Sequence, residues 1–491
     1  MNNIPFISII VSMASAIVLL LLSKKGKLAQ TIALCVLVFV AVLSGVMIPY
    51  FLSNPEPITY MLGHYPSPWG NELRFGLLES ILAFVFSTVL LLAILGGKKD
   101  IEEDIQSRKV NQYFALLMLL LLSLLALIYT NDIFTAYVFI EINTVASCGI
   151  VMVKESGETL RATIKYLFMS LMASGLFLIS IAILYSITGH LLIPALSESI
   201  QGLVQSGQYK WPLYTAGALI TISLGVKSAL FPFHTWLPDA HGTATTASSS
   251  ILSGVVVKGY IILLIKIYYR VFGIETVQNM GLLNVVLVLG MAGMIFGSIS
   301  AIKEDNIKRM IAYSSVAQIG YIYAGIGIGT TAGLAAALFH MIVHAYTKPL
   351  LFSSAGGLIR VSNHSKLISN LKGSARRNKL AGIGFLIGSM SMVGVPLFGG
   401  FASKVYLASS ASDKGYLFLI ALALSSFLNA LYYLPALMKI YGKAEETVEE
   451  ETEKSDFSYT MSIVCFSIVN IVFGVAGIYV MHLLNQGVQL L

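Results

Sequence analysis

Six charged residues lie inside long apolar segments or near their ends: Glu141, Lys227, Lys258, Lys266, Lys348 and Lys404. A charge at the centre of a bilayer costs at least about 2.5–3.5 kcal/mol, so such residues rarely persist without a role. Static ion pairs are the structural alternative, but desolvation offsets most of their attraction. Charges distributed through the interior therefore favour an ion or proton pathway over structural ion pairs. Lys266, beside Tyr269 and Arg270 at a helix end, is expected to extend to the membrane interface instead, and the same alternative is open for Lys348, about one turn from a cytoplasmic helix end.

His340, His344 and Lys348 follow one another at i, i+4 and i+8, so they share one face of a helix. Histidine exchanges protons near neutral pH, which makes this face a candidate proton relay. A structural contact between the two histidines is the ordinary alternative. A metal site is disfavoured because no third ligand or neighbouring glutamate base accompanies them.

Cofactor motifs are not evident in the sequence. The three cysteines, Cys35, Cys148 and Cys465, lack metal-ligand spacing and are interpreted as packing residues. No glycine-rich nucleotide loop, iron–sulfur cysteine set or haem ligand pair is convincing. We therefore expect neither a metal nor a cofactor, and redox chemistry, if present, would belong to partner subunits.

The composition defines the environment of these residues. Of 491 residues, 56% are hydrophobic and 11% charged, whereas soluble proteins carry about 25% charged residues. Too little polar surface is available to cover a soluble globule of this size. Disordered, collagen-like, disulfide-rich and nucleic-acid-binding proteins are excluded on the same ground, despite a net charge of +7. The sequence predicts a polytopic membrane protein.

Apolar runs of about 20 residues predict about 14 transmembrane helices and an all-α fold. The expected ranges are 4–23, 29–52, 77–97, 111–129, 131–153, 162–186, 210–231, 243–272, 279–302, 307–327, 330–353, 381–412, 415–442 and 457–485. Runs this long exclude a membrane β-barrel. The first range lacks a basic leader and a cleavage site, so a retained helix is expected. The acidic segment Glu445–Glu453 is expected to be a solvated loop.

The lysines and arginines predict the orientation. Odd-numbered connections between the expected helices hold 22 of the 31 basic residues, and even-numbered connections hold 4. Positively charged loops stay in the cytoplasm. We therefore expect the odd connections to be cytoplasmic and both termini to face outward.

Prolines interrupt the seventh and twelfth expected helices. Pro232 and Pro238 follow Lys227, and Pro396 precedes Lys404. Such breaks persist at membrane depth only where protein or a watery cavity covers them. Paired broken helices in two halves of a chain point to a transport site.

The two broken helices belong to five-helix blocks, 111–272 and 279–442. Because each block has an odd number of helices, the second must have the opposite membrane orientation, which predicts an inverted repeat. A three-helix segment (1–110) precedes the blocks. The acidic loop and a last helix (443–491) follow them.

Four segments, 227–241, 305–321, 339–348 and 400–404, resemble motifs of one known family. They are similar, in the same order, to the proton-translocating antiporter-like subunits of complex I, of membrane-bound hydrogenases and of Mrp-type sodium/proton antiporters. The resemblance covers about residues 75 to 440.

The resemblance implies a role for each buried charge. The family's fifth, seventh and eighth helices would supply Glu141, its partner Lys227 and the bridging Lys258. The eleventh and twelfth helices would supply the rest of the proton relay: His340, His344, Lys348 and Lys404. Secondary candidates for proton transfer are His234, Asp239 and His241.

Two departures from the family pattern narrow the assignment. Arg161 stands where an acidic residue is expected, and Lys404 replaces the glutamate of one complex I branch. The sequence also lacks the lateral helix of the largest complex I subunit and the extra domains of the large Mrp subunit. These features favour a protein like the D-type subunit of Mrp antiporters or its hydrogenase-complex counterpart.

We expect a proton-translocating subunit of a larger complex in the cell membrane, most similar to the D-type subunit of Mrp Na+/H+ antiporters. The expected partners are other membrane subunits, lipid, protons and, as a second candidate ion, sodium; nucleic acid is not expected. The alternative is an ion-pumping subunit of a membrane-bound hydrogenase or a complex I-type NADH:quinone oxidoreductase. A stand-alone carrier of a small organic solute would need a roomy binding pocket rather than a line of lysines.

Overall fold

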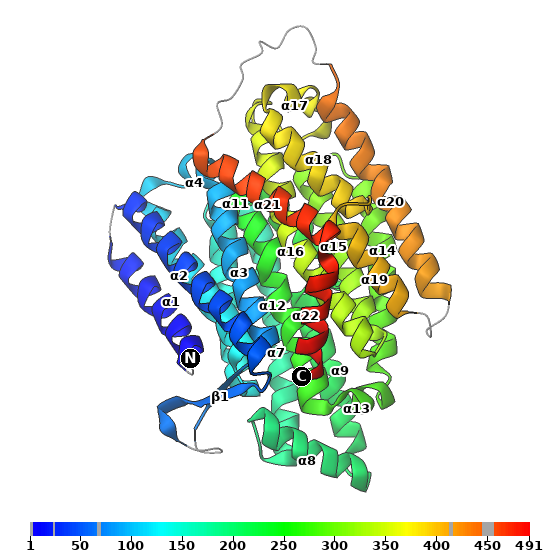
Figure 1. Ribbon diagram of the computed structural model, residues 1–491. Helices are drawn as coiled ribbons and strands as arrows, with labels where there is room; N and C mark the ends of the chain where they lie inside the picture. Colours follow the sequence, from blue (N-terminus) through cyan, green and yellow to red (C-terminus); the bar gives the residue numbers. More distant parts are fainter. Residues whose placement is uncertain (1–2, 23–24, 66–69, 412–415, 444–455) are drawn as a thin grey trace.

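The computed structural model describes residues 3–22, 25–65, 70–411, 416–443 and 456–491. These residues form a bundle of long helices with a small β-hairpin at one end (Figure 1). Eleven helical segments among them are long and apolar enough to cross a membrane. The chain is therefore a mostly helical, multi-pass membrane protein. The predicted loop Glu445–Glu453 lies outside the described residues.

The chain begins with α1 (Ile4–Leu21), α2 (Gly26–Ser53), β1 (Ile58–Met61), η1 (Leu62–His64), β2 (Glu72–Phe75), α3 (Leu77–Gly96) and α4 (Lys98–Asp104). The next elements are η2 (Ser107–Lys109), α5 (Val110–Tyr129), α6 (Ile133–Met152), α7 (Gly157–Thr188), α8 (Ile193–Ser206), α9 (Lys210–Lys227), η3 (Phe233–Thr235), α10 (Trp236–Thr243), α11 (Thr246–Ile251), η4 (Leu252–Val256), α12 (Val257–Lys266) and η5 (Ile267–Phe272).

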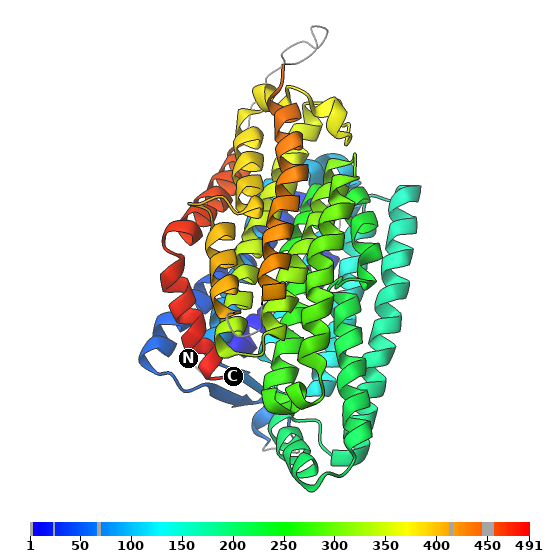
Figure 2. The ribbon, with the colours of Figure 1, turned by 90° about the vertical axis from the view of Figure 1, so that its right-hand side faces the viewer.

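The remaining elements are α13 (Ile274–Asn279), α14 (Leu282–Ile302), α15 (Ile307–Gly327), α16 (Thr331–Arg360), η6 (Ile368–Leu371), α17 (Ser374–Arg377), α18 (Lys379–Val393), α19 (Gly399–Ser410), α20 (Tyr416–Tyr441), α21 (Phe457–Val475) and α22 (Gly477–Gln489). Helix α7 lies on one flank of the bundle, and α21 and α22 lie on the opposite flank (Figure 2).

Three of the expected ranges, 210–231, 307–327 and 381–412, are not among the eleven long apolar segments. In the first range α9 ends at Lys227, the third range is divided between α18 and α19, and α15 carries many polar residues along its 21-residue length. The last expected range also divides, at Ala476, into α21 and α22.

Helix α8 and the β-hairpin are among the elements that lie outside the expected ranges. Helix α8 buries Ile193, Leu196 and Ile200 on one face, which is the spacing of an amphipathic helix. Strands β1 and β2 pair antiparallel, with Ile58 opposite Phe75. Both elements lie in connections at the same end of the bundle (Figure 1).

The two expected interruptions are present. Helix α9 ends at Lys227, and α10 begins at Trp236, where Pro238 falls in the first turn and removes no needed hydrogen bond. Helix α18 ends at Val393, and α19 begins at Gly399 after Gly394, whose φ of 94° favours glycine.

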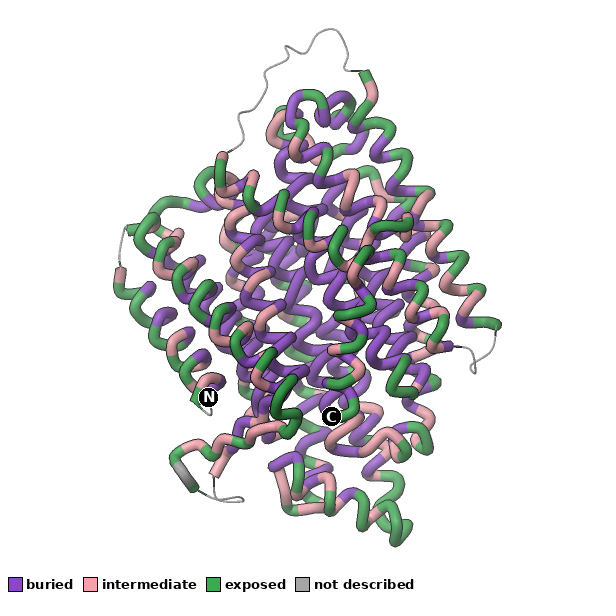
Figure 3. Tube along the Cα trace, viewed as in Figure 1, coloured by how far each residue is buried: buried purple, intermediate pink, exposed green. Residues whose placement is uncertain are grey.

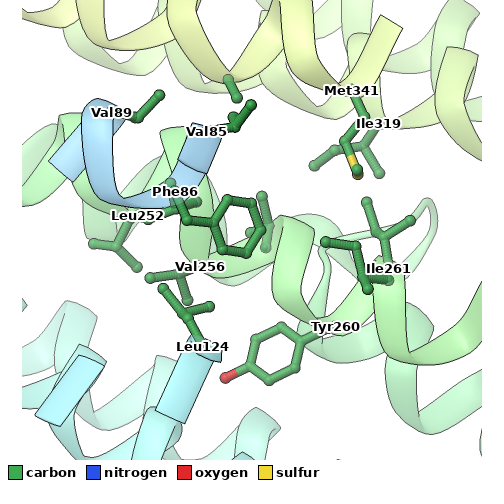
Figure 4. Packing of buried hydrophobic residues seen from close by; sticks show 14 of the residues in the cluster. Val85, Phe86, Val89, Leu124, Leu252, Val256, Tyr260, Ile261, Ile319 and Met341 are labelled. Carbon is green, nitrogen blue, oxygen red and sulfur yellow. The ribbon is translucent and has the colours of Figure 1, made fainter. Parts of the chain in front are cut away.

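The core lies where the helices cross. Buried residues fill the centre of the bundle, and exposed ones lie on the outer helices (Figure 3). Phe86 of α3, Leu124 of α5 and Val256 of η4 pack around one another beside Tyr260 of α12 (Figure 4). The polar relay candidates are thus set into an apolar interior.

Helices α14 and α15 meet backbone to backbone through glycines. A Cβ added at Gly320 would lie 2.5 Å from the Gly290 carbonyl oxygen, and one at Gly290 would lie 2.6 Å from the Ala324 nitrogen. Small residues allow such close approach between membrane helices. This contact fixes how α15 is placed against α14.

We predict that Gly320→Ala lowers the free energy of unfolding by about 1–3 kcal/mol, because the new methyl group forces the two backbones apart. Thermal unfolding in detergent, followed by intrinsic fluorescence, measures this loss. Gly175→Ala in α7 is the matched control, since a Cβ there meets nothing within 4 Å. Equal stability of the two variants would contradict the prediction.

Candidate functional site

The four principal lysines of the predicted relay, Lys227, Lys258, Lys348 and Lys404, are all buried in the bundle. His340 and His344 are buried as well. In a dry interior each ammonium group needs oxygen acceptors or a counter-charge. The contacts of each lysine therefore define the chemistry available to it.

Lys227, the last residue of α9, is the principal lysine that faces a carboxylate. Its Nζ lies 4.0 Å from Oε1 of Glu141 on α6 and donates a 2.8 Å hydrogen bond to Oγ1 of Thr144. Asp132 caps the start of α6 by accepting from the Thr135 amide at 2.6 Å, which holds the helix that carries Glu141. The side chain of Glu141 is 27% exposed, whereas that of Lys227 is 0% exposed.

Lys258 lies on α12, directly after the π-helical turn η4. Its Nζ donates to the backbone oxygen of Ser253 within that turn. The Ser253 hydroxyl in turn lies 3.0 Å from the Ser315 hydroxyl of α15. A π-turn leaves carbonyl groups out of the regular ladder, and here one of them receives the lysine.

The predicted histidine face is present on α16. The His340 and His344 rings are stacked 6.5 Å apart, and Nδ1 of His340 lies 2.9 Å from Oγ of Ser403. Both ring nitrogens of His344 are buried without a hydrogen-bond partner among the described residues. Buried imidazoles of this kind call for bridging water.

Lys348, one turn beyond His344, points to α15. Its Nζ donates to the Ile311 carbonyl at 3.0 Å and also to the Ser314 hydroxyl. Lys348 is buried, so it does not extend to the interface.

Lys404 lies on α19, after the second helix break. Its Nζ donates to the carbonyl oxygens of Met392 and Val393, each at 2.9 Å, at the end of α18. Cations are favoured at helix C-termini. The break thus creates the acceptors that hold this lysine.

The secondary candidates lie around α10. Asp239 joins two cations: its oxygens lie 2.8 Å from Nζ of Lys165 on α7 and 2.6 Å from a guanidinium nitrogen of Arg309 on α15. His241 is buried and stacks on Phe352 at 4.8 Å, with neither ring nitrogen hydrogen-bonded among the described residues. His234 stacks on Phe231 at 5.5 Å.

A cavity of about 470 Å³ opens beside α10, and its lining includes Arg161, Lys165, Asp239, Arg309 and Lys366. Lys366, in the loop after α16, donates to the Gly242 carbonyl at 2.8 Å. Burial lowers the pKa of Lys366, and the charge of Lys154 lowers it further. The cavity therefore places positively and negatively charged side chains together beside α10.

Two buried cations differ from the sequence analysis. Lys266, expected at the interface, is 3% exposed and donates to the carbonyls of Leu127, Ile128 and Thr130 at the end of α5. Lys308, included among the 22 basic residues of the odd-numbered connections although it lies at the start of the expected range 307–327, is buried and donates to the Ala244 carbonyl at 3.0 Å. The carbonyl acceptors of both lysines belong to other helices, so no local sequence pattern reveals them. The position of Lys308, two residues after Asn306 at a helix start, does indicate that it lies inside α15.

No group of three or more His, Cys, Asp or Glu side chains in the described part of the chain is arranged to hold a metal ion. The candidate residues supply buried ammonium and imidazole groups, neighbouring hydroxyl groups and the partly exposed carboxylates of Glu141 and Asp239. Such a set can hold and transfer protons with the help of water.

We predict that Lys308→Met lowers the free energy of unfolding by about 1.5–3 kcal/mol, because it leaves the Ala244 carbonyl at the end of α10 without its charged donor. Thermal unfolding in detergent measures the loss. Lys303→Met changes an exposed lysine five residues away and should leave stability unchanged. A Lys308→Met protein as stable as this control would show that the contact does not stabilise the fold.

Comparisons with known proteins identify the relatives of this chain. Residues 130–429 match the family described as NADH:quinone oxidoreductase/Mrp antiporter, TM. The N subunit of the NADH-quinone oxidoreductase of Desulforudis audaxviator (strain MP104C) is 32% identical over 394 residues, covering 80% of this chain and 77% of that protein. The D-type subunit of the Na(+)/H(+) antiporter of Bacillus subtilis (strain 168) is 25% identical over 495 residues, covering 100% and 97%.

Two solved structures share the fold. A chain of the Mrp complex from Dietzia sp. DQ12-45-1b superposes with a TM-score of 0.88 at 22% identity, covering 99% of this chain and 96% of that one. A chain of the membrane-bound sulfane sulfur reductase, an archaeal respiratory membrane complex, also gives 0.88, at 24% identity and with 99% and 97% coverage. The resemblance predicted from the four motifs is confirmed, and the chain belongs to the NADH:quinone oxidoreductase/Mrp antiporter transmembrane family.

Proposed function

We propose that this chain is the proton-translocating subunit of a multi-subunit membrane complex, most similar in role to the D-type subunit of Mrp Na+/H+ antiporters. The observation that carries the proposal is the pair formed by the buried Lys227 and the partly exposed Glu141, 4.0 Å apart, followed in the interior by further lysines and histidines. The similarity to the Bacillus subtilis antiporter protein over the whole chain supports it.

The pair acts as a switch. A dry interior favours the neutral amine, and a nearby carboxylate favours the ammonium ion. With Glu141 close, Lys227 holds its proton; when the two separate, the proton leaves for an acceptor farther along the row. The long 4.0 Å separation is consistent with a pair that opens and closes.

The rest of the row passes the proton onward. Lys258 would receive it through water and deliver it to the unpartnered ring of His344. His340 would receive the proton next. Its Nδ1 lies 2.9 Å from Oγ of Ser403, the residue that precedes Lys404. Lys348, on the same helix face as the two histidines, would exchange protons with them and is held on its other side by Ser314. His234, Asp239 and His241 would connect the row to the cavity beside α10.

Fourteen membrane crossings and an inverted repeat form part of the proposal. The eleven long segments, together with α9–α10, α15 and α18–α19, make up fourteen. Matching hydrogen-bonded bridges support the repeat, because Asp132 bridges Leu192 before α6 and Asn306 bridges Leu367 before α15. We assign 111–272 and 279–442 to the two repeats, 1–110 to the N-terminal segment and 443–491 to the C-terminal part.

We further propose that both termini face outward from the cell membrane. The basic connections 98–109 and 360–379 lie at the end of the bundle that carries α4 and α17, opposite the end with β1 and α8 (Figure 1). Positively charged connections stay in the cytoplasm, so the β1–α8 end would be outside.

Partner subunits would cover the α6 flank. Glu141 lies mid-way along α6 and is 27% exposed, and its exposed neighbours Phe134, Val138 and Val145 are apolar. A carboxylate open to lipid at this depth is costly. A neighbouring membrane subunit would remove that exposure.

We predict that Glu141→Gln and Lys227→Met each reduce proton transport at least tenfold, because either change removes the charge pair that switches. Proton flux is measured in vesicles that contain the whole complex, with expression level and assembly checked in parallel. Glu198→Gln in α8 is the control, since this glutamate is exposed and outside the row. Retention of transport by the first two variants would refute the mechanism.

The orientation is tested with single cysteine reporters in a background without the native cysteines. Glu198→Cys in α8 should react with an impermeant maleimide added to intact cells, because even connections are proposed to lie outside. Lys303→Cys in an odd connection should react only after permeabilisation. The reverse pattern would overturn the topology.

The second candidate is an ion-pumping subunit of a redox-driven complex. The 32% identity to the N subunit of an NADH-quinone oxidoreductase favours it, as does the fold shared with the sulfane sulfur reductase. Sodium-dependent proton flux in vesicles without an electron donor supports the antiporter. Flux that starts only when a donor is added supports the redox-driven pump.

A further inference from the structure

We propose that Tyr260 and Tyr321 are positioning residues that hold the two broken-helix lysines as ammonium ions by presenting the faces of their rings to them. Nζ of Lys227 lies 5.6 Å from the ring centroid of Tyr260, and Nζ of Lys404 lies 5.3 Å from that of Tyr321. This inference rests on the proposed function, and it names residues that the four-lysine row alone does not include.

The geometry favours the charged form of each lysine. A cation within about 6 Å of an aromatic ring face is attracted by the ring quadrupole, and the attraction is larger where water is absent. Both tyrosines and both lysines are buried. A neutral amine gains little from the same ring, so the contact distinguishes the two protonation states.

Hydrogen bonds fix the rings in place. The Tyr260 hydroxyl donates to Oδ1 of Asn143 at 2.9 Å, and Asn143 donates to the Ser123 hydroxyl at 2.9 Å. The Tyr321 hydroxyl lies 3.3 Å from that of Ser426. The Tyr321 ring also stacks on the His340 ring, with 5.2 Å between the ring centroids. Neither ring can leave its lysine without breaking these contacts.

The two lysines differ in what else faces them. Lys227 is faced by Glu141 and Cys148 of α6 as well as by Tyr260 of α12. Lys404 is faced by Tyr321 of α15 and His340 of α16, and it forms no salt bridge within the described ranges. The Tyr321 ring and the two α18 carbonyls thus take the place that Glu141 has in the first repeat.

The test compares Tyr321→Phe, which keeps the ring, with Tyr321→Leu, which removes it, in vesicles that contain the whole complex. Proton flux is recorded as a function of pH. Without the ring, the loss of flux at alkaline pH should begin about one pH unit lower, a tenfold change in proton affinity. Tyr321→Phe should keep the alkaline limb where the unmodified complex has it.

Tyr113→Leu is the matched control for the cavity left by a buried tyrosine, since Tyr113 is buried in α5 and its ring faces no lysine of the described segments. This variant should lose thermal stability like Tyr321→Leu while its pH profile stays in place. Tyr260→Leu should shift the profile in the same direction, but less, because Glu141 still faces Lys227.

Two outcomes would overturn the inference: an unshifted limb in Tyr321→Leu, or an equal shift in Tyr321→Phe, which would assign the effect to the hydroxyl group. Lys404→Met in the same vesicles separates this failure from that of the proposed function. If Lys404→Met stops transport and Tyr321→Leu leaves the limb unshifted, only the ring contact is refuted. If Lys404→Met transports normally, the relay itself is refuted.

Discussion

The structure depends on one requirement, that an ammonium group in a dry interior must find oxygen acceptors. Carbonyls at irregular helix ends satisfy it. Lys404 uses the end of α18, Lys266 the end of α5 and Lys308 the end of α10. The last carbonyls of a helix have no partner within the helix. Helix ends therefore supply acceptors for these three buried charges, whereas Lys348 uses the Ile311 carbonyl and the Ser314 hydroxyl within α15.

The two proposed repeats meet the requirement differently. Glu141 lies eight residues after Ile133, where α6 begins, and Ser315 lies eight residues after Ile307, where α15 begins. The first repeat thus has a carboxylate where the second has a hydroxyl group. The ion pair of Glu141 and Lys227 can open and close. Lys404 is held by backbone carbonyls and the Tyr321 ring, so among the described residues it has no counter-ion from which it could separate. In the proposed mechanism, the same helical arrangement provides a switch in one half and a stationary proton carrier in the other.

Much of this architecture could be predicted from the sequence because hydropathy and proline positions are local signals. The breaks after Lys227 and before Lys404, and the shared face of His340, His344 and Lys348, follow from spacing alone. Acceptors that another helix supplies leave no local pattern in the sequence. For this reason Lys266 was wrongly expected at the interface, and Lys308 was counted with the loop residues. Helix α8 was missed because it lies outside the long apolar runs by which the elements were located.

Helix α15 contacts nearly every part of the row. Its residues reach Asp239 through Arg309, Ser253 through Ser315 and Lys404 through Tyr321. Because Gly320 and Gly290 hold its backbone against α14, α15 cannot turn about its axis without a clash. A close-packed interior transmits such a displacement instead of absorbing it. A shift of α10 at the charged cavity would therefore act through Arg309 on the helix that also carries Ser315 and Tyr321, so one rigid helix couples the cavity to the interior of the proposed pathway.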